Sequence, residues 1–165
     1  MVVELEKVKG DGRIALQHLF ELGAYDLSEL SGSDINECGR FITNPAIIDW
    51  FDDPNYSPFF IRANGRIAGF VVIKYIVEED IHYLNHFFVL RKYRNQHIGK
   101  QAASMAFDRF EGYWRVSQFD WNLPAQKFWR KVLASYTNGT YTETRRKDNK
   151  GPMQEFKADW STPVK

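Results

Sequence analysis

The chain has 165 residues with 22 Lys+Arg and 21 Asp+Glu, so its formal net charge is +1. This length predicts one domain, residues 1–165, with a sizeable core. A near-neutral chain has no global field that would recruit nucleic acid or an anionic membrane, so recognition of a charged ligand has to be local. Cys38 is the only cysteine, which excludes an internal disulfide and fits a reducing, cytoplasmic compartment.

The N-terminal region predicts a strand followed by a helix. Val3 and Leu5 alternate with acidic residues as in a strand, and residues 12–30 carry apolar side chains at helical spacing. The start lacks the long apolar segment of a signal peptide, and no apolar run approaches the roughly 18 residues of a membrane span. We therefore expect a soluble protein that is not exported.

The central part of the chain predicts loops and then a β-hairpin. Residues 45–58 contain three prolines and are expected to form loops around a short helix or turn near residues 47–51. Residues 58–62 and 67–73 are β-rich and are joined by Asn64-Gly65, which is the strongest short hairpin signal.

The second half of the chain predicts alternating strands and helices. In order, these are a strand at residues 82–90, a helix from Ile98 to near Gly112, a strand at 115–120, a helix introduced by Asn122, and strands at 140–146 and 152–158. The first of these helices is predicted to bury an apolar stripe made of Ile98, Ala102, Met105, Ala106 and Phe110.

The junction between the strand at 82–90 and the next helix concentrates positive charge. Its four cations are Arg91, Lys92, Arg94 and Lys100. The first N–H groups of a helix have no internal partners and the helix dipole is positive there, so the junction suits a phosphate or pyrophosphate. Gly99 lets such a ligand approach without a Cβ in the way. The alternative is that Gly99 only eases helix packing and that the cations are solvated on a surface turn.

Two blocks of the sequence resemble the GNAT superfamily of N-acyltransferases. Residues 94–100, Arg-Asn-Gln-His-Ile-Gly-Lys, are similar to the Gln/Arg-x-x-Gly-x-Gly/Ala segment whose amides cradle the coenzyme A pyrophosphate. Residues 122–131 resemble the second block, Asn-x-x-Ala-x-x-Phe-Tyr. The core resemblance covers residues 67–133, and the two blocks stand in the order that the superfamily has.

The resemblance implies an α/β (α+β) domain with a mixed sheet of about six to seven strands, flanked by helices and splayed near Val89 to admit the pantetheine arm. It implies transfer of an acetyl group from acetyl-CoA to an amine, with no metal. The cofactor-binding residues that it implies are Val89, Arg94, Asn95, Gln96, His97, Ile98, Gly99, Lys100, Asn122, Ala125, Phe128 and Trp129.

The sequence departs from the superfamily pattern at two positions. Gln101 stands where a small Gly or Ala is usual, which alters one edge of the pyrophosphate loop. Trp129 stands where a tyrosine often protonates the departing thiolate, and an indole N–H is not a useful proton donor. A thiolate whose conjugate acid has a pKa of about 8.5 is already a fair leaving group, so water can supply that proton.

Two catalytic contacts are expected on the strand at residues 82–90. The Val89 backbone N–H is the candidate oxyanion contact. His86, with an unperturbed pKa of about 6.5, is the candidate base in a region where the superfamily often has a carboxylate. The alternative for His86 is a strand histidine satisfied by packing. His82 and His86 would lie roughly 13 Å apart along a strand, so they cannot share a metal ion.

The acceptor is an amine that the sequence does not identify. The aromatic residues that could line its pocket, or simply pack, are Trp50, Phe51, Tyr56 and Phe59. Two other functions stay open: a GNAT-like protein that senses acyl-CoA without catalysis, which Trp129 favours, and a nucleic-acid-binding module, which the near-zero charge disfavours. Nucleic acid and membranes are not expected partners, and a homodimer is left open.

Overall fold

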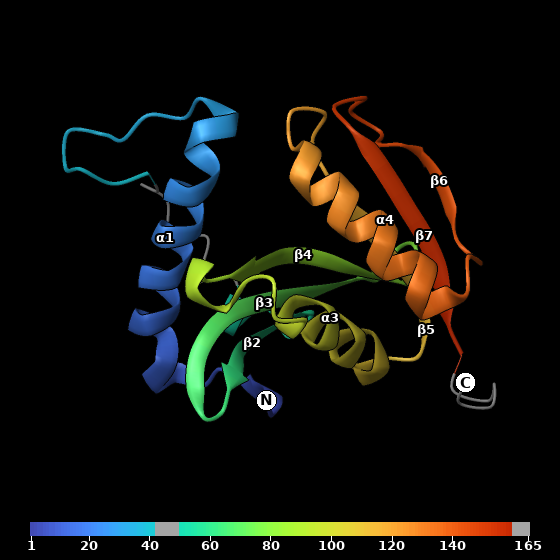
Figure 1. Cartoon of the computed structure of the whole chain (residues 1–165), viewed down its shortest axis with the longest axis horizontal. Helices are drawn as coiled ribbons and strands as arrows, with labels where there is room; N and C mark the ends of the chain where they lie inside the picture. The colour runs from blue at the N-terminus through green and yellow to red at the C-terminus, as the bar shows by residue number, and fades with distance from the viewer. Residues whose placement is uncertain (42–49, 160–165) are drawn as a thin grey trace.

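The computed structural model describes residues 1–41 and 50–159, which form a mixed β-sheet with helices on both faces (Figure 1). Among these residues, seven strands lie in the order β1-β2-β3-β4-β5-β7-β6. The strands are β1 Val3–Lys7, β2 Tyr56–Ala63, β3 Arg66–Ile76, β4 Ile81–Val89, β5 Gly112–Ser117, β6 Thr142–Arg145 and β7 Pro152–Ala158. The helices are α1 Arg13–Ser31, α3 Ile98–Arg109 and α4 Leu123–Thr137, with 3-10 turns η1 Gly10–Gly12 and η2 Arg91–Tyr93. The predicted α/β class and strand number are confirmed.

The hairpin between β2 and β3 forms where the Asn-Gly pair predicts it. Ala63 pairs with Arg66, and the two residues between them both have positive φ, 50° at Asn64 and 80° at Gly65. Positive φ at both central residues is the type I′ turn, whose twist matches that of the flanking strands. The turn therefore sets the register of β2 against β3.

Each face of the sheet has its own apolar core. α3 and α4 cover one face, where their apolar residues pack on side chains of β2 to β5 and β7; the largest fully buried members are Phe107, Trp114, Ile61, Ile73, Ile98 and Leu133. α1 covers the other face over β2 to β4, where the cluster contains Leu16, Leu19, Trp50, Phe60, Phe70 and Val72. In Figure 1, α1 accordingly lies apart from the α3–α4 pair.

The buried stripe of α3 differs from the predicted one. Ala103 and Phe107 are fully buried, whereas Met105 is half-buried and Phe110 lies beyond the end of the helix. The helix stops at Arg109 because the backbone of Phe110 is extended, and its carbonyl accepts a 2.8 Å hydrogen bond from the Trp114 indole. This early stop moves β5 three residues closer to the N-terminus than predicted.

The sheet opens between β4 and β5. These parallel strands pair only at Ile81–Tyr113, His82–Trp114 and Tyr83–Arg115, and β4 then continues to its end alongside β3 without β5. We call the open region between residues 84–89 of β4 and the end of β5 the fork. The fork begins next to Leu84 and includes Val89, so the sheet is open where the sequence predicts it.

A β-bulge bends β4 where the fork begins. Ile73 of β3 pairs with Leu84, but the preceding Val72 pairs with His86, so Asn85 is the extra residue. A bulge bends its strand and increases the local twist, which turns the end of β4 away from β5. In Figure 1, β3 and β4 run across the view, whereas β6 and β7 are steeply inclined to them.

Two further sequence predictions concern the segment near residues 47–51 and the absence of a membrane span. Of the short helix or turn predicted near residues 47–51, only 50 and 51 are described, and both are helical. Among the residues that the structure describes, none of the helices has the length and apolar character needed to cross a membrane.

Candidate functional site

The edge of β4 that faces the fork has backbone groups available for a ligand. The N–H of Leu90 donates to Ala68 O on the β3 side at 2.8 Å. Successive N–H groups alternate in direction along a strand, so those of Phe87 and Val89 point to the opposite side, into the fork. Within the described residues β5 has already diverged there, and neither N–H is used in the sheet.

The backbone before α3 leaves a group of N–H donors at the end of β4. His97, the N-cap residue, has a left-handed backbone with φ 62°, and Asn95 has φ 59°. The helical hydrogen bonds begin with the Gln101 N–H, which donates to His97 O at 3.0 Å. Hence the N–H groups of Ile98, Gly99 and Lys100 have no intrahelical acceptor, and the positive end of the helix dipole lies at the same place. This arrangement suits an anion.

The side chains around this helix end differ in their freedom to meet a ligand. Asn95, Gln96, His97 and Lys100 are exposed. Arg94 is held in place, because its Nε donates to Val89 O at 3.0 Å and its Nη2 pairs with an Asp26 oxygen at 2.7 Å. The structure thus brings the predicted loop residues together, but it gives Arg94 protein partners.

Gly99 lies where two helices and β4 meet. A Cβ built on Gly99 would approach the ring of Phe128 to 3.2 Å and Cγ2 of Val89 to 3.8 Å. The missing side chain therefore serves close packing of α3 on α4, as the alternative interpretation expects. The same packing holds the free N–H groups of α3 beside the fork, so the two interpretations are compatible.

The second sequence block forms the start of α4. The side chain of Asn122 caps the helix, because its Oδ1 accepts a hydrogen bond from the Ala125 N–H at 3.2 Å. Phe128 is half-buried and its ring stacks 6.0 Å from that of Phe87 on β4. Trp129 is 6% exposed and packs edge-on against the same Phe87 at 5.0 Å, so it belongs to the core.

His86 lies on the α1 face of β4, beside the bulge. Its ring is edge-on to Phe20 at 4.9 Å and lies 5.1 Å from Trp50. Burial among these rings lowers the pKa of His86 to about 4, because the charged imidazolium loses its hydration there. His86 is therefore neutral at pH 7, but it is a weaker base than the sequence alone suggests.

The buried neutral state of His86 predicts a pH-dependent stability. An unfolded histidine titrates at about 6.5, whereas His86 in the folded protein titrates at about 4. Between these values the unfolded state binds more protons, so stability falls as the pH drops through this window. We expect a loss of about 2 kcal/mol in unfolding free energy from pH 7 to pH 5.

The measurement is urea unfolding of the wild type and His86→Gln at both pH values. The variant has no imidazole to titrate, so its loss over this interval should be smaller by about 2 kcal/mol. Equal losses in the two proteins would contradict the burial argument.

The four aromatic residues proposed for an acceptor pocket serve mainly in packing. Trp50 and Phe59 are each 3% exposed and lie in the two cores. Phe51 and Tyr56 are half-buried; Phe51 lies under the Arg13 guanidinium at 4.8 Å. For the buried pair, the expectation that packing is the main role is correct.

A hydroxyl pair at the base of the fork was not found from the sequence. The Tyr83 hydroxyl and Ser117 Oγ lie 2.7 Å apart. Tyr83 is the last residue of β4 that pairs with β5, and Ser117 lies two residues beyond Arg115, the partner of Tyr83. The two residues are 34 positions apart in the chain, and only the parallel pairing of their strands brings them together. No local pattern signals such a contact.

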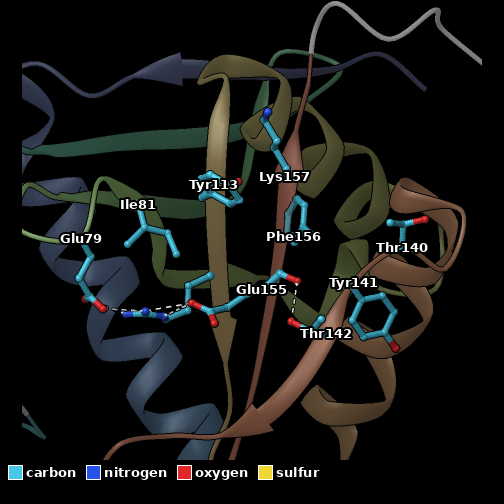
Figure 2. A pocket seen from close by; sticks show the side chains of 10 residues that line it. Glu79, Ile81, Tyr113, Thr140, Tyr141, Thr142, Glu155, Phe156 and Lys157 are labelled. Carbon is cyan, nitrogen blue, oxygen red and sulfur yellow. Dashed lines mark hydrogen bonds and ion pairs between the residues drawn. The ribbon is translucent and has the colours of Figure 1, made fainter.

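A separate depression lies on the sheet face away from α3 and α4, over β5, β6 and β7 (Figure 2). Its volume is about 610 Å³, and Arg115, one of the residues that line it, pairs with Glu79 and Glu155, each at 2.9 Å. Hydrogen bonds from Arg115 and then Lys147 lower the pKa of Glu79 to about 2. Since Arg115 pairs with Tyr83, the depression lies over the closed end of the β4–β5 pair, away from the open end of the fork.

A known family model covers most of these elements. The acetyltransferase (GNAT) family matches residues 24–134, which is more than half of the chain. The chain belongs to the GNAT family. The match includes β4, the loop before α3 and most of α4, so it contains the fork and both sequence blocks.

Solved structures support this GNAT fold at low sequence identity. An acetyltransferase from Thermus thermophilus has a TM-score of 0.73 and 13% identity, covering 96% of this chain and 98% of that one. The ribosomal-protein-S18-alanine N-acetyltransferase of Escherichia coli has a TM-score of 0.61 and 12% identity, covering 96% and 95%. The PaiA N-acetyltransferase of Thermoplasma acidophilum, solved in complex with coenzyme A, has a TM-score of 0.62 and 17% identity, covering 96% and 100%. No curated protein matched the sequence significantly.

Proposed function

We propose that this GNAT protein transfers an acetyl group from acetyl-CoA to a primary amine of a small molecule or peptide. The observation that carries the proposal is the continuity of two features: the free edge of β4 at Val89 and the free N–H groups at the start of α3. A pantetheine arm with amide groups suits a free strand edge, and a pyrophosphate suits a helix N-terminus. Acetyl-CoA carries both groups in one molecule.

The loop backbone favours one alignment with the Gln/Arg-x-x-Gly-x-Gly/Ala segment. An alignment that begins at Gln96 places Gln101 at the final small residue. An alignment that begins at Arg94 places His97 at the first glycine and Gly99 at the last position. His97 has the left-handed φ of 62° that glycine adopts most readily, which supports the second alignment. Gln101 then lies one turn into α3 and need not touch the pyrophosphate.

The remaining predicted contacts are part of the same proposal. The N–H groups of residues 95–100 would hold the pyrophosphate, with the exposed Lys100 adding positive charge. Phe128 borders the fork from α4. Asn122 and Ala125 would support the cofactor site indirectly, through the cap that starts α4. Trp129 would support it through core packing.

The chemistry requires a neutral amine and a stabilised thioester oxygen. The Val89 N–H would donate to this oxygen as negative charge develops on it, as an oxyanion hole does. The amine forms the new C–N bond, the C–S bond breaks, and coenzyme A leaves as a thiolate that water protonates. We propose that neutral His86 receives the proton of the amine, through water because its ring is enclosed by Phe20 and Trp50.

The test is a thiol-release assay with acetyl-CoA and a panel of amines, amino acids, aminoglycosides and peptide N-termini. We expect saturable thiol release with at least one acceptor, and a lower kcat in His86→Gln with unchanged acetyl-CoA binding. Normal kcat and pH profile in His86→Gln would leave His86 a packing residue.

A second candidate function is acyl-CoA binding without catalysis. The core position of Trp129 favours it, because no tyrosine hydroxyl stands there to protonate the thiolate. Binding of acetyl-CoA with no thiol release across the whole panel would select this function. A nucleic-acid-binding role would instead show affinity that falls steeply with salt. The exposed free thiol of Cys38 agrees with a cytoplasmic location, and a homodimer stays a prediction.

A further inference from the structure

Asp26 connects α1 to the edge of β4 and to the loop before α3. Its two carboxylate oxygens accept hydrogen bonds from different arginines: Oδ2 from Arg94 Nη2 at 2.7 Å and Oδ1 from Arg91 Nε at 2.8 Å. Arg94 also donates its Nε to Val89 O at 3.0 Å. One carboxylate on α1 thus holds the guanidinium that contacts the last residue of β4.

Asp26 is the most buried member of this cluster, and Arg91, with a side chain that is 68% exposed, is the most exposed member. The side chain of Asp26 is 18% exposed and that of Arg94 is 38% exposed. Burial alone raises the pKa of Asp26, but the hydrogen bonds from Arg94 and Arg91 outweigh it, so the pKa lies below its ordinary value. Asp26 is therefore ionised at neutral pH and neutralises positive charge beside the anion site.

Packing around the cluster fixes α1 against β4. A Cβ on Gly23, one turn before Asp26, would lie only 3.4 Å from the Phe88 ring, so the helix approaches β4 closely at this point. The Arg94 guanidinium lies 5.8 Å from the same ring. Asp26 is therefore aimed at Arg94 by the position of the whole helix.

We propose that Asp26 is a positioning residue for the coenzyme A site, which holds Arg94 as a brace on the Val89 carbonyl rather than as a ligand of the pyrophosphate. This inference rests on the proposed function. The brace fixes the last residue of β4 and the loop that carries the free N–H groups of α3. It also links α1 mechanically to the cofactor loop.

The two roles of Arg94, brace or direct phosphate contact, predict opposite changes in coenzyme A affinity when Asp26 is replaced by Asn. If Arg94 bound the pyrophosphate, Asp26→Asn would remove a competing negative charge and free the guanidinium, so coenzyme A would bind more tightly. If Arg94 is a brace, the loop loses its anchor and coenzyme A binds more weakly. Coupled groups in one network typically interact strongly enough to change affinity roughly tenfold.

The experiment titrates coenzyme A calorimetrically into the wild type, Asp26→Asn, Arg94→Lys and the control Glu29→Gln. Glu29 is exposed on α1 near Arg91, so its substitution removes the same charge without breaking the brace. We expect the Kd to rise roughly tenfold in Asp26→Asn and Arg94→Lys, and to stay within about twofold in Glu29→Gln. In turnover, the KM for acetyl-CoA should rise more than kcat falls.

A second experiment tests the brace without any ligand. Amide hydrogen exchange of residues 94–100 in the free protein should speed up in Asp26→Asn and not in Glu29→Gln. Unchanged exchange, or a wild type that binds coenzyme A while Asp26→Asn binds it equally or more tightly, would overturn the brace and leave the proposed function standing. A wild type that binds no coenzyme A would overturn the proposed function and, with it, the role of Asp26 in cofactor binding.

Discussion

Gly99→Asp is expected to abolish binding of acetyl-CoA. The new carboxylate stands beside the free N–H groups of α3, where a pyrophosphate would lie, and like charges about 4 Å apart repel by roughly 4 kcal/mol near a protein surface. Since each 1.4 kcal/mol is a factor of about ten, micromolar binding would become weaker than millimolar. The new Cβ also presses on Phe128, which it approaches to 3.2 Å.

The matched control for this substitution is Gly99→Ala, which adds the same Cβ without the charge. We expect Gly99→Ala to weaken binding much less, because the Phe128 ring can shift by a few tenths of an ångström. Calorimetric titration with acetyl-CoA gives the affinities, and circular dichroism checks that both variants are folded. A folded Gly99→Asp that binds like the wild type would contradict a pyrophosphate site at this helix end.

Gly69→Ala is expected to damage both the sheet and the cofactor site. A Cβ on Gly69 would overlap the carbonyl oxygen of Phe88 and approach Val89 Cα to 3.0 Å. Both atoms belong to the backbone of β4, so no side-chain rotation relieves the contact. Overpacking of this kind costs about 3 kcal/mol, and the β3–β4 pairing has to shift where the Val89 N–H enters the fork.

The control for Gly69→Ala is Gly10→Ala, since a Cβ on Gly10 has no atom within 4 Å in the described structure. Urea unfolding should show a loss of about 3 kcal/mol for Gly69→Ala and a change within about 0.5 kcal/mol for the control. Acetyl-CoA affinity should fall in Gly69→Ala alone. Equal stability of the two variants would show that β3 and β4 are not tightly packed at this point.

Features governed by neighbours in the chain were predictable from the sequence. Asn64-Gly65 predicts its hairpin because a two-residue turn needs positive φ at both positions. Asn122 predicts the start of α4 because the cap is a contact with Ala125, three residues away. The spacing of apolar residues likewise located α1, α3 and α4, with errors at their ends.

Features governed by tertiary contacts were not predictable. The fork begins at Leu84 because a bulge at Asn85 bends β4, and no local pattern marks that residue. The contact of Arg94 with Asp26 was likewise not predictable, because Asp26 lies 68 residues earlier on α1. The pKa of His86 depends on how α1 and Trp50 pack over its ring, which residue spacing along β4 does not contain.

The most direct test of the account is a titration of the isotope-labelled 19.4 kDa protein with coenzyme A, followed by amide NMR. We expect the largest shifts on the amides of residues 95–100 and of Val89, with saturation at a single site. Shifts confined to the depression around Arg115, or no shifts at millimolar ligand, would contradict a coenzyme A site at the fork.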